Sequence, residues 1–131
     1  MEKPLGRFIK DPGTLAPILL NLHQKRVHIF GGGNKALSSL QGFLSSEAEI
    51  IVQAPTISEE VRACRGIFPD IRHIKFIERD YQQGDEEEAF IVVAAMDIKE
   101  LNRQITNRCR DQMILVSDVD HPETSDFMVP V

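Results

Sequence analysis

The chain has 131 residues, of which 42% are hydrophobic and 27% charged, and its formal net charge is −5 at pH 7. This length fits one domain with its own core, and the composition excludes a disordered or fibrous protein. The negative charge argues against nucleic acid or an anionic membrane as a partner, and no apolar stretch is long enough to span a bilayer. Two widely separated cysteines, Cys64 and Cys109, predict reduced thiols in a cytoplasmic protein.

Residues 1–24 contain three prolines and precede the first apolar run, so we expect an N-terminal surface segment. Continuous apolar runs, which are typical of buried parallel strands, occupy residues 27–30, 49–53, 89–95 and 113–116. A fifth run, residues 73–77, alternates more and predicts a strand nearer the edge of the sheet. The acidic run at residues 85–88 predicts a solvated loop or the start of a helix.

Helical patterns lie between these runs. Apolar residues recur at helical spacing in residues 37–44, and Ser58 before two glutamates is typical of a helix N-cap. Asp97 is expected to cap a third helix in which Ile98, Leu101 and Ile105 share one face. Alternating strands and helices with short connections predict an α/β fold, a Rossmann-type doubly wound and mostly parallel sheet with helices on both faces. We expect residues 1–131 to form this single domain.

The glycine-rich turn Gly31-Gly32-Gly33 follows the first strand and opens a helix. Gly31 would let the chain turn sharply, and Gly33 would let backbone N–H groups approach a pyrophosphate at the positive end of that helix. Ala36 supplies the small residue that close packing of helix and strand requires. This context predicts a site for a dinucleotide phosphate, the alternative being a tight turn without a ligand.

The second strand ends in Gln53 and lacks the acidic residue that commonly binds the adenosine ribose. Gln53 or Thr56 is expected to hydrogen-bond a ribose hydroxyl instead. No arginine stands beside this strand end in the sequence to hold a 2′-phosphate, which favours NAD over NADP as the cofactor.

Three segments, in the same order, resemble the N-terminal domain of siroheme synthases and the precorrin-2 dehydrogenase (sirohydrochlorin ferrochelatase) family. They are Leu15 to Leu22 leading into Lys25 to Gly33, Ala94 to Asp97 with Leu101-Asn102, and Val116 to Pro122 followed by Ser125 to Pro130. The last segment resembles a family pattern of an aspartate turn, a proline and a terminal strand. The resemblance covers nearly the whole chain.

The resemblance implies NAD-dependent oxidation of precorrin-2 to sirohydrochlorin in siroheme biosynthesis, with a tetrapyrrole substrate. It implies that Asn34, Lys35, Pro55 and Thr56 contact the dinucleotide. Gly31, Gly32 and Gly33 of the turn, and Ala95 and Met96 after the fourth strand, are also expected to bind the cofactor. Asp120 stands where the family keeps its important aspartate.

The chemistry supports a role for Asp120, because removing a hydride and a proton from the macrocycle requires a positioned base. Asp120 as a turn-forming residue is the alternative, and the two roles are compatible. Carboxylate and imidazole groups of the kind found at Asp118, Asp120, His121 and Asp126 can bind ferrous iron, but we expect no permanent metal site in this surface turn. His28 is expected to be a hydrogen-bonded core histidine.

The sequence also departs from the family pattern. Its relatives continue into a helical region that dimerises and closes over the tetrapyrrole, so we expect a homodimer or a partner chain to supply that region. Lys35 replaces an apolar residue, Ser38 and Ser39 replace basic ones, Met96 replaces a threonine and Ser117 an asparagine. Lys35 is the one well-placed cation for a polycarboxylate substrate. Two hypotheses follow: an NAD-dependent dehydrogenase, and a non-catalytic NAD-binding subunit or sensor module.

Overall fold

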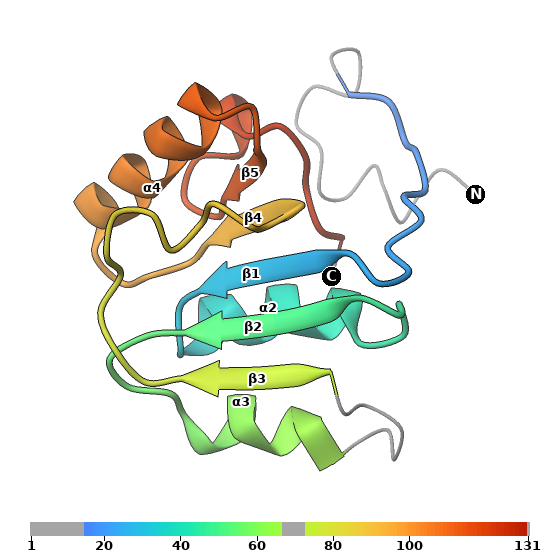
Figure 1. Ribbon diagram of the computed structural model, residues 1–131, viewed down its shortest axis with the longest axis vertical. Coiled ribbons are helices and arrows are strands. Elements are labelled where there is room, and N and C mark those ends of the chain that lie inside the picture. Colours follow the sequence, from blue (N-terminus) through green and yellow to red (C-terminus); the bar gives the residue numbers. More distant parts are fainter. Residues whose placement is uncertain (1–14, 67–72, 131) are drawn as a thin grey trace.

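The computed structural model describes residues 15–66 and 73–130, and their centre is a five-stranded parallel sheet (Figure 1). The strands lie in the order β3-β2-β1-β4-β5. Their bounds are β1, Arg26–Phe30; β2, Glu49–Gln53; β3, Ile74–Ile77; β4, Ile91–Ala94; and β5, Leu115–Asp118. The predicted parallel sheet is therefore confirmed, with β3 at an edge as its alternating pattern indicated.

Three α-helices accompany the sheet: α2, Asn34–Phe43; α3, Glu59–Ala63; and α4, Lys99–Asp111. Short 3₁₀ turns follow at Cys64–Gly66 and Pro122–Thr124. The chain winds from β1 to β3 in one direction and from β4 to β5 in the other. Right-handed connections therefore place α2 and α3 on one face and α4 on the other, and Figure 1 shows α2 behind β1 and β2. This is the doubly wound, Rossmann-type arrangement that the alternating pattern predicts.

The core is built from strands that are buried along nearly their whole length. Every residue of β4 is buried, and so is every residue of β1 and β2 after the first. Continuous apolar runs form such strands because helices or loops cover both faces of the sheet. The carboxyl ends of all five strands consequently meet at one edge, the place where ligands bind in sheets of this type.

Helix starts agree with the sequence in one case and differ in another. The Ser58 side chain accepts a hydrogen bond from the Val61 N–H, which confirms it as the N-cap of α3. Asp97 was wrongly predicted to cap α4, since the N-cap is Ile98 and no side chain caps this helix. Ile98 is 62% exposed, because at the N-cap position it lies outside the helix and not on the buried face that contains Ile105.

The final strand and the segment after it are shifted from the prediction. Met113 has φ 63° and forms part of a turn, so β5 begins at Leu115 instead of residue 113. Residues 127–130 form no strand, contrary to the family pattern. The backbone N–H of Asp126 donates to the Val116 carbonyl, and its carboxylate accepts from the Val116 N–H. Asp126 thereby pairs with the backbone N–H and carbonyl of Val116 on the outer edge of β5, as a further strand would do.

The connection between β3 and β4, residues 78–90, contains no helix and was partly mispredicted. Glu86 is fully buried, and its carboxylate accepts hydrogen bonds from the Tyr81 hydroxyl at 2.7 Å and the Gln112 amide at 2.5 Å. Asp85 is also largely buried and is paired with Arg79. Half of the acidic run is therefore buried and not a solvated loop, because Arg79, Tyr81 and Gln112 pair with or donate to its carboxylates.

The N-terminal segment is described only from residue 15 onward; residues 1–14 lie outside the described part. Residues 15–24 form no helix or strand. Most of their side chains are exposed, whereas Leu22 is buried in the core. Among the described residues, no helix is long and apolar enough to cross a membrane. Both cysteines are free and buried.

Candidate functional site

Two glycines of the turn bring the ends of neighbouring strands into direct backbone contact. Gly31 has φ 154°, and a Cβ atom there would lie 2.3 Å from the Ala95 carbonyl oxygen. A Cβ at Gly32 would lie 2.1 Å from the Thr56 carbonyl oxygen. Only glycine allows these approaches, so the turn, the loop after β2 and the loop after β4 meet at one place.

Gly33 differs from the other two glycines, because a Cβ atom there would meet nothing within 4 Å. It is the N-cap of α2 and provides no side-chain cap. Within the described residues, no acceptor is found for the backbone N–H groups of Gly33, Asn34 and Lys35. An open backbone surface beside free N–H groups fits the phosphates of a dinucleotide.

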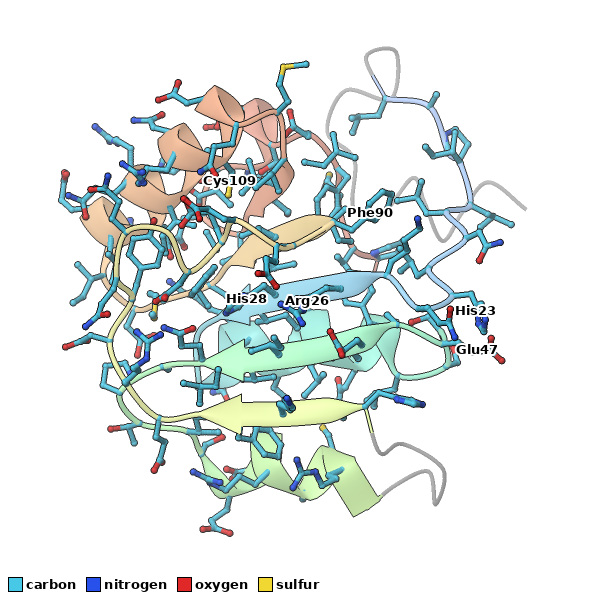
Figure 2. All side chains as sticks on the ribbon, in the orientation of Figure 1. His23, Arg26, His28, Glu47, Phe90 and Cys109 are labelled. Carbon is cyan, nitrogen blue, oxygen red and sulfur yellow. The ribbon has the colours of Figure 1, made fainter. Side chains whose placement is uncertain are left out.

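The Gln53 side chain lies away from the position expected for a ribose ligand. It is fully buried, its amide oxygen is 3.0 Å from His28 Nε2, and its amide nitrogen donates to Asp85 at 2.8 Å. Its backbone carbonyl instead accepts from the Gly31 N–H. His28 is the hydrogen-bonded core histidine that was expected, and Figure 2 labels it on β1. Burial lowers the pKa of His28 from 6.5 to about 4.

Sequence reasoning missed the charged pair beside this strand end. The Arg79 guanidinium donates to both carboxylate oxygens of Asp85 at 2.9 Å, and Asp85 accepts from Gln53. An arginine therefore does approach the end of β2, contrary to the expectation on which the preference for NAD rested. Arg79 comes from the end of the neighbouring strand β3, so only the parallel pairing of β2 with β3 could have revealed it.

Asp120 follows β5 at the same edge and makes two side-chain contacts. Its Oδ1 atom lies 2.9 Å from the Lys35 ammonium, and its Oδ2 atom accepts from the Asn102 amide at 3.2 Å. The Lys35 hydrogen bond is the main cause that holds the pKa of Asp120 below its ordinary value, and Asn102 and Lys99 act in the same direction. Lys99 is thus a second cation near Asp120, which the sequence alone did not indicate.

A hollow of about 240 Å³ lies next to this ion pair. The first turns of α2 line one side, and the end of β5 with the segment after it lines the other. Its lining residues include Lys35, Ser38, Ser117, Asp120 and Val129. The space is therefore bordered by both the candidate base and the helix that begins at the glycine turn.

The structure thus gathers most of the predicted site residues at one edge. Asn34, Pro55 and Thr56 are exposed beside the turn, whereas Ala95 and Met96 are buried. Lys35 contacts Asp120, although it was expected to contact the dinucleotide. In the described part of the chain, no three His, Cys, Asp or Glu side chains gather as metal ligands would.

Comparison with known proteins shows which family has this fold and glycine turn. Residues 18–131 match the family described as "Putative NAD(P)-binding". The chain belongs to this family. Such a description fits the sheet, the glycine turn and the open N-terminus of α2, and it leaves the choice between the two nicotinamide dinucleotides open.

The resemblance to siroheme synthases and precorrin-2 dehydrogenases is also confirmed. The chain is 27% identical over 114 residues to a siroheme synthase of Thioalkalivibrio sulfidiphilus. This match covers 87% of this chain and 22% of that protein. It is 28% identical over 116 residues to a precorrin-2 dehydrogenase of Bacillus subtilis, and this match covers 88% of this chain and 68% of the relative. The chain therefore spans about a fifth of the siroheme synthase it matches.

Among solved structures, the chain is similar to "SirC, precorrin-2 dehydrogenase", with a TM-score of 0.73 and 24% sequence identity. The match covers 89% of this chain and 55% of that one. At this level of identity the likeness shows a shared fold. It agrees with the Rossmann-type sheet described above.

Proposed function

We propose that this chain is the dinucleotide-binding part of an NAD-dependent precorrin-2 dehydrogenase, which oxidises precorrin-2 to sirohydrochlorin. Its similarity to siroheme synthases and to a precorrin-2 dehydrogenase supports the reaction. NAD is preferred over NADP because Arg79, the cation near the end of β2, is engaged by both oxygens of Asp85. A 2′-phosphate would have to compete with that carboxylate for the guanidinium.

The cofactor would lie along the glycine turn. Backbone N–H groups at the start of α2 would bind its pyrophosphate, where the helix dipole favours negative charge. The loop at Pro55 and Thr56 and the loop at Ala95 and Met96 would flank it. When bound, the nicotinamide supplies the hydride acceptor of the reaction.

Asp120 would act as the general base. Oxidation removes a hydride and a proton from the substrate, and a carboxylate beside the reacting carbon can take that proton and release it to solvent. Asp120 is ionised at neutral pH, as a base requires, and Lys35 lowers its pKa further below the ordinary value of 3.8. The same lowering makes it a weaker proton acceptor, so close positioning must compensate.

One observation carries this proposal: Lys35, on the helix that begins at the glycine turn, is in ion-pair contact with Asp120 at the end of β5. The candidate base and the candidate cofactor cradle are therefore separated by a single side chain. A precorrin-2 molecule, which bears many carboxylates, would also meet the positive charges of Lys35 and Lys99 here. We propose that a second copy or a partner chain provides further basic groups.

The test supplies precorrin-2 and NAD to the folded chain and follows the absorbance of NADH. We expect turnover, and a loss of about 100-fold or more in Asp120→Ala with dinucleotide affinity retained. NAD binding by calorimetry without any turnover would instead favour a non-catalytic binding module. Failure to bind either dinucleotide would contradict both functions.

A further inference from the structure

Asn102 connects two parts of the candidate site through one buried side chain. It lies in the first turn of α4 and is fully buried. Its amide oxygen accepts from the Met96 backbone N–H at 2.8 Å, and its amide nitrogen donates to the Met96 carbonyl at 2.9 Å. The side chain is therefore fixed against the backbone just beyond β4.

This pairing determines where the remaining donor of Asn102 points. An asparagine amide has two N–H groups, and the Met96 carbonyl occupies one of them. The other donates to Asp120 Oδ2 at 3.2 Å. Reversing the amide would set its nitrogen against the Met96 N–H, so only one orientation satisfies the backbone.

Asp120 is consequently held from two sides. Lys35 of α2 binds one carboxylate oxygen and Asn102 of α4 binds the other. These two contacts are unequal in rigidity, because the Lys35 side chain is 38% exposed whereas that of Asn102 is completely buried. A ligand with negative charge can displace Lys35, but it cannot easily move Asn102.

We propose that Asn102 is a positioning residue of the dehydrogenase, which fixes the Asp120 carboxylate relative to the backbone at Met96. This inference rests on the proposed function, in which Asp120 is the base and Met96 flanks the cofactor. A base must be held within a fraction of an ångström of its productive position for efficient proton transfer. Asn102 meets this need with a donor that is itself fixed by the Met96 backbone, just beyond β4.

The first test uses the cofactor-free chain and needs no turnover. Carboxyl carbon NMR measures the pKa of Asp120 in the wild type, in Asn102→Ala and in the matched control Thr106→Val. Thr106 is buried on the same helix and donates only to the Asn102 carbonyl. We expect a higher Asp120 pKa in Asn102→Ala and an unchanged one in Thr106→Val. Lys35 and Lys99, the cations that lower the Asp120 pKa, are the same in all three chains, and so is Asp118, whose carboxylate accepts from the Asp120 backbone N–H.

A second measurement avoids the risk that Asn102→Ala does not fold. In the wild-type chain, the side-chain N–H signals of Asn102 should shift with pH as Asp120 titrates, and this shift should disappear in Asp120→Ala. Asn102 side-chain N–H signals that do not shift as Asp120 titrates would overturn the inference.

Turnover then separates a positioning role from a merely structural one. We expect Asn102→Ala to lower kcat by about 10- to 100-fold and to move the acidic limb of the pH profile upward. A rise in the KM for NAD alone, with kcat and pH profile unchanged, would mean that Asn102 only supports Met96. If the wild type shows no turnover, the proposed function fails, while the NMR titration still decides whether Asn102 controls Asp120.

Discussion

The Lys35 ammonium lies 2.9 Å from the Asp120 carboxylate and joins the helix after the glycine turn to the end of β5. Lys35 was expected to contact the dinucleotide, yet its partner in this structure is the candidate base Asp120. A ligand that attracts Lys35 would release one oxygen of Asp120 and leave the Asn102 contact in place. Displacement of Lys35 would therefore raise the pKa of Asp120, which couples the two side chains.

Lys35→Met tests this coupling. Because Lys35 is the main cause of the lowered Asp120 pKa, the variant should raise that pKa and move the acidic limb of activity to higher pH. The pair should contribute less than about 1 kcal/mol to stability, since Lys35 is partly exposed. A depressed carboxylate pKa stabilises the fold above the ordinary value of 3.8 and ceases to do so as the pH falls below it. Urea unfolding of both chains across this pH range would show the difference vanish in acid.

Gly33 and Gly32 form a matched pair of substitutions. Gly33→Val should lower the free energy of unfolding by at most about 1 kcal/mol, because its Cβ would enter open space and valine is only a poorer N-cap than glycine, but it should weaken dinucleotide binding by obstructing the phosphates. Gly32→Ala should instead destabilise the fold by about 1–3 kcal/mol, because its Cβ would overlap the Thr56 carbonyl. Urea unfolding measures the stability of both variants, and calorimetric titration with NAD measures their dinucleotide affinity. Equal NAD affinity in Gly33→Val and the wild type would contradict the proposed cradle.

His28 should make stability depend on pH in mildly acidic solution. Its pKa is lowered from 6.5 to about 4, so between these values the unfolded chain binds a proton that the folded chain excludes. Stability should therefore be full above pH 6.5 and fall by about 3 kcal/mol as the pH approaches 4. In His28→Phe this slope should flatten, although loss of the Gln53 contact lowers stability at every pH. If the free energy of unfolding changed with pH equally in the wild type and in His28→Phe, His28 would not be the group responsible.

The sequence was sufficient for those parts of the fold in which local pattern and burial coincide. The strand at Glu49–Gln53 was predicted with its observed bounds, and the Ser58 cap was predicted from its own residues. Both depend on neighbours along the chain. The glycine turn was recognisable for the same reason, since its strand, turn and helix are consecutive.

The parts that were mispredicted depend on contacts between distant segments. The buried Glu86 carboxylate accepts from nearby Tyr81 and also from Gln112, and the acidic run itself does not indicate the second, distant partner. Gln53 was expected at a ribose because it ends β2, but its side chain is bound by His28 and Asp85. Asn102 was recognised only as part of a family resemblance, and its contact with Asp120 required the packing of α4 against β4 and β5. Charges and amides find partners in three dimensions, which local patterns do not encode.

The helix-free connection at residues 78–90 has a consequence for how the chain folds. It must carry the chain from β3, at one edge, past β2 and β1 before Ile91 can pair with Val27. The segment has local contacts of its own, such as those of Asp85 with Arg79 and Gln82, but the pairing of β4 with β1 is non-local and requires this loop to close first. We therefore expect the β1–β3 half to assemble first and the docking of β4, completed by burial of Glu86, to limit the rate of folding.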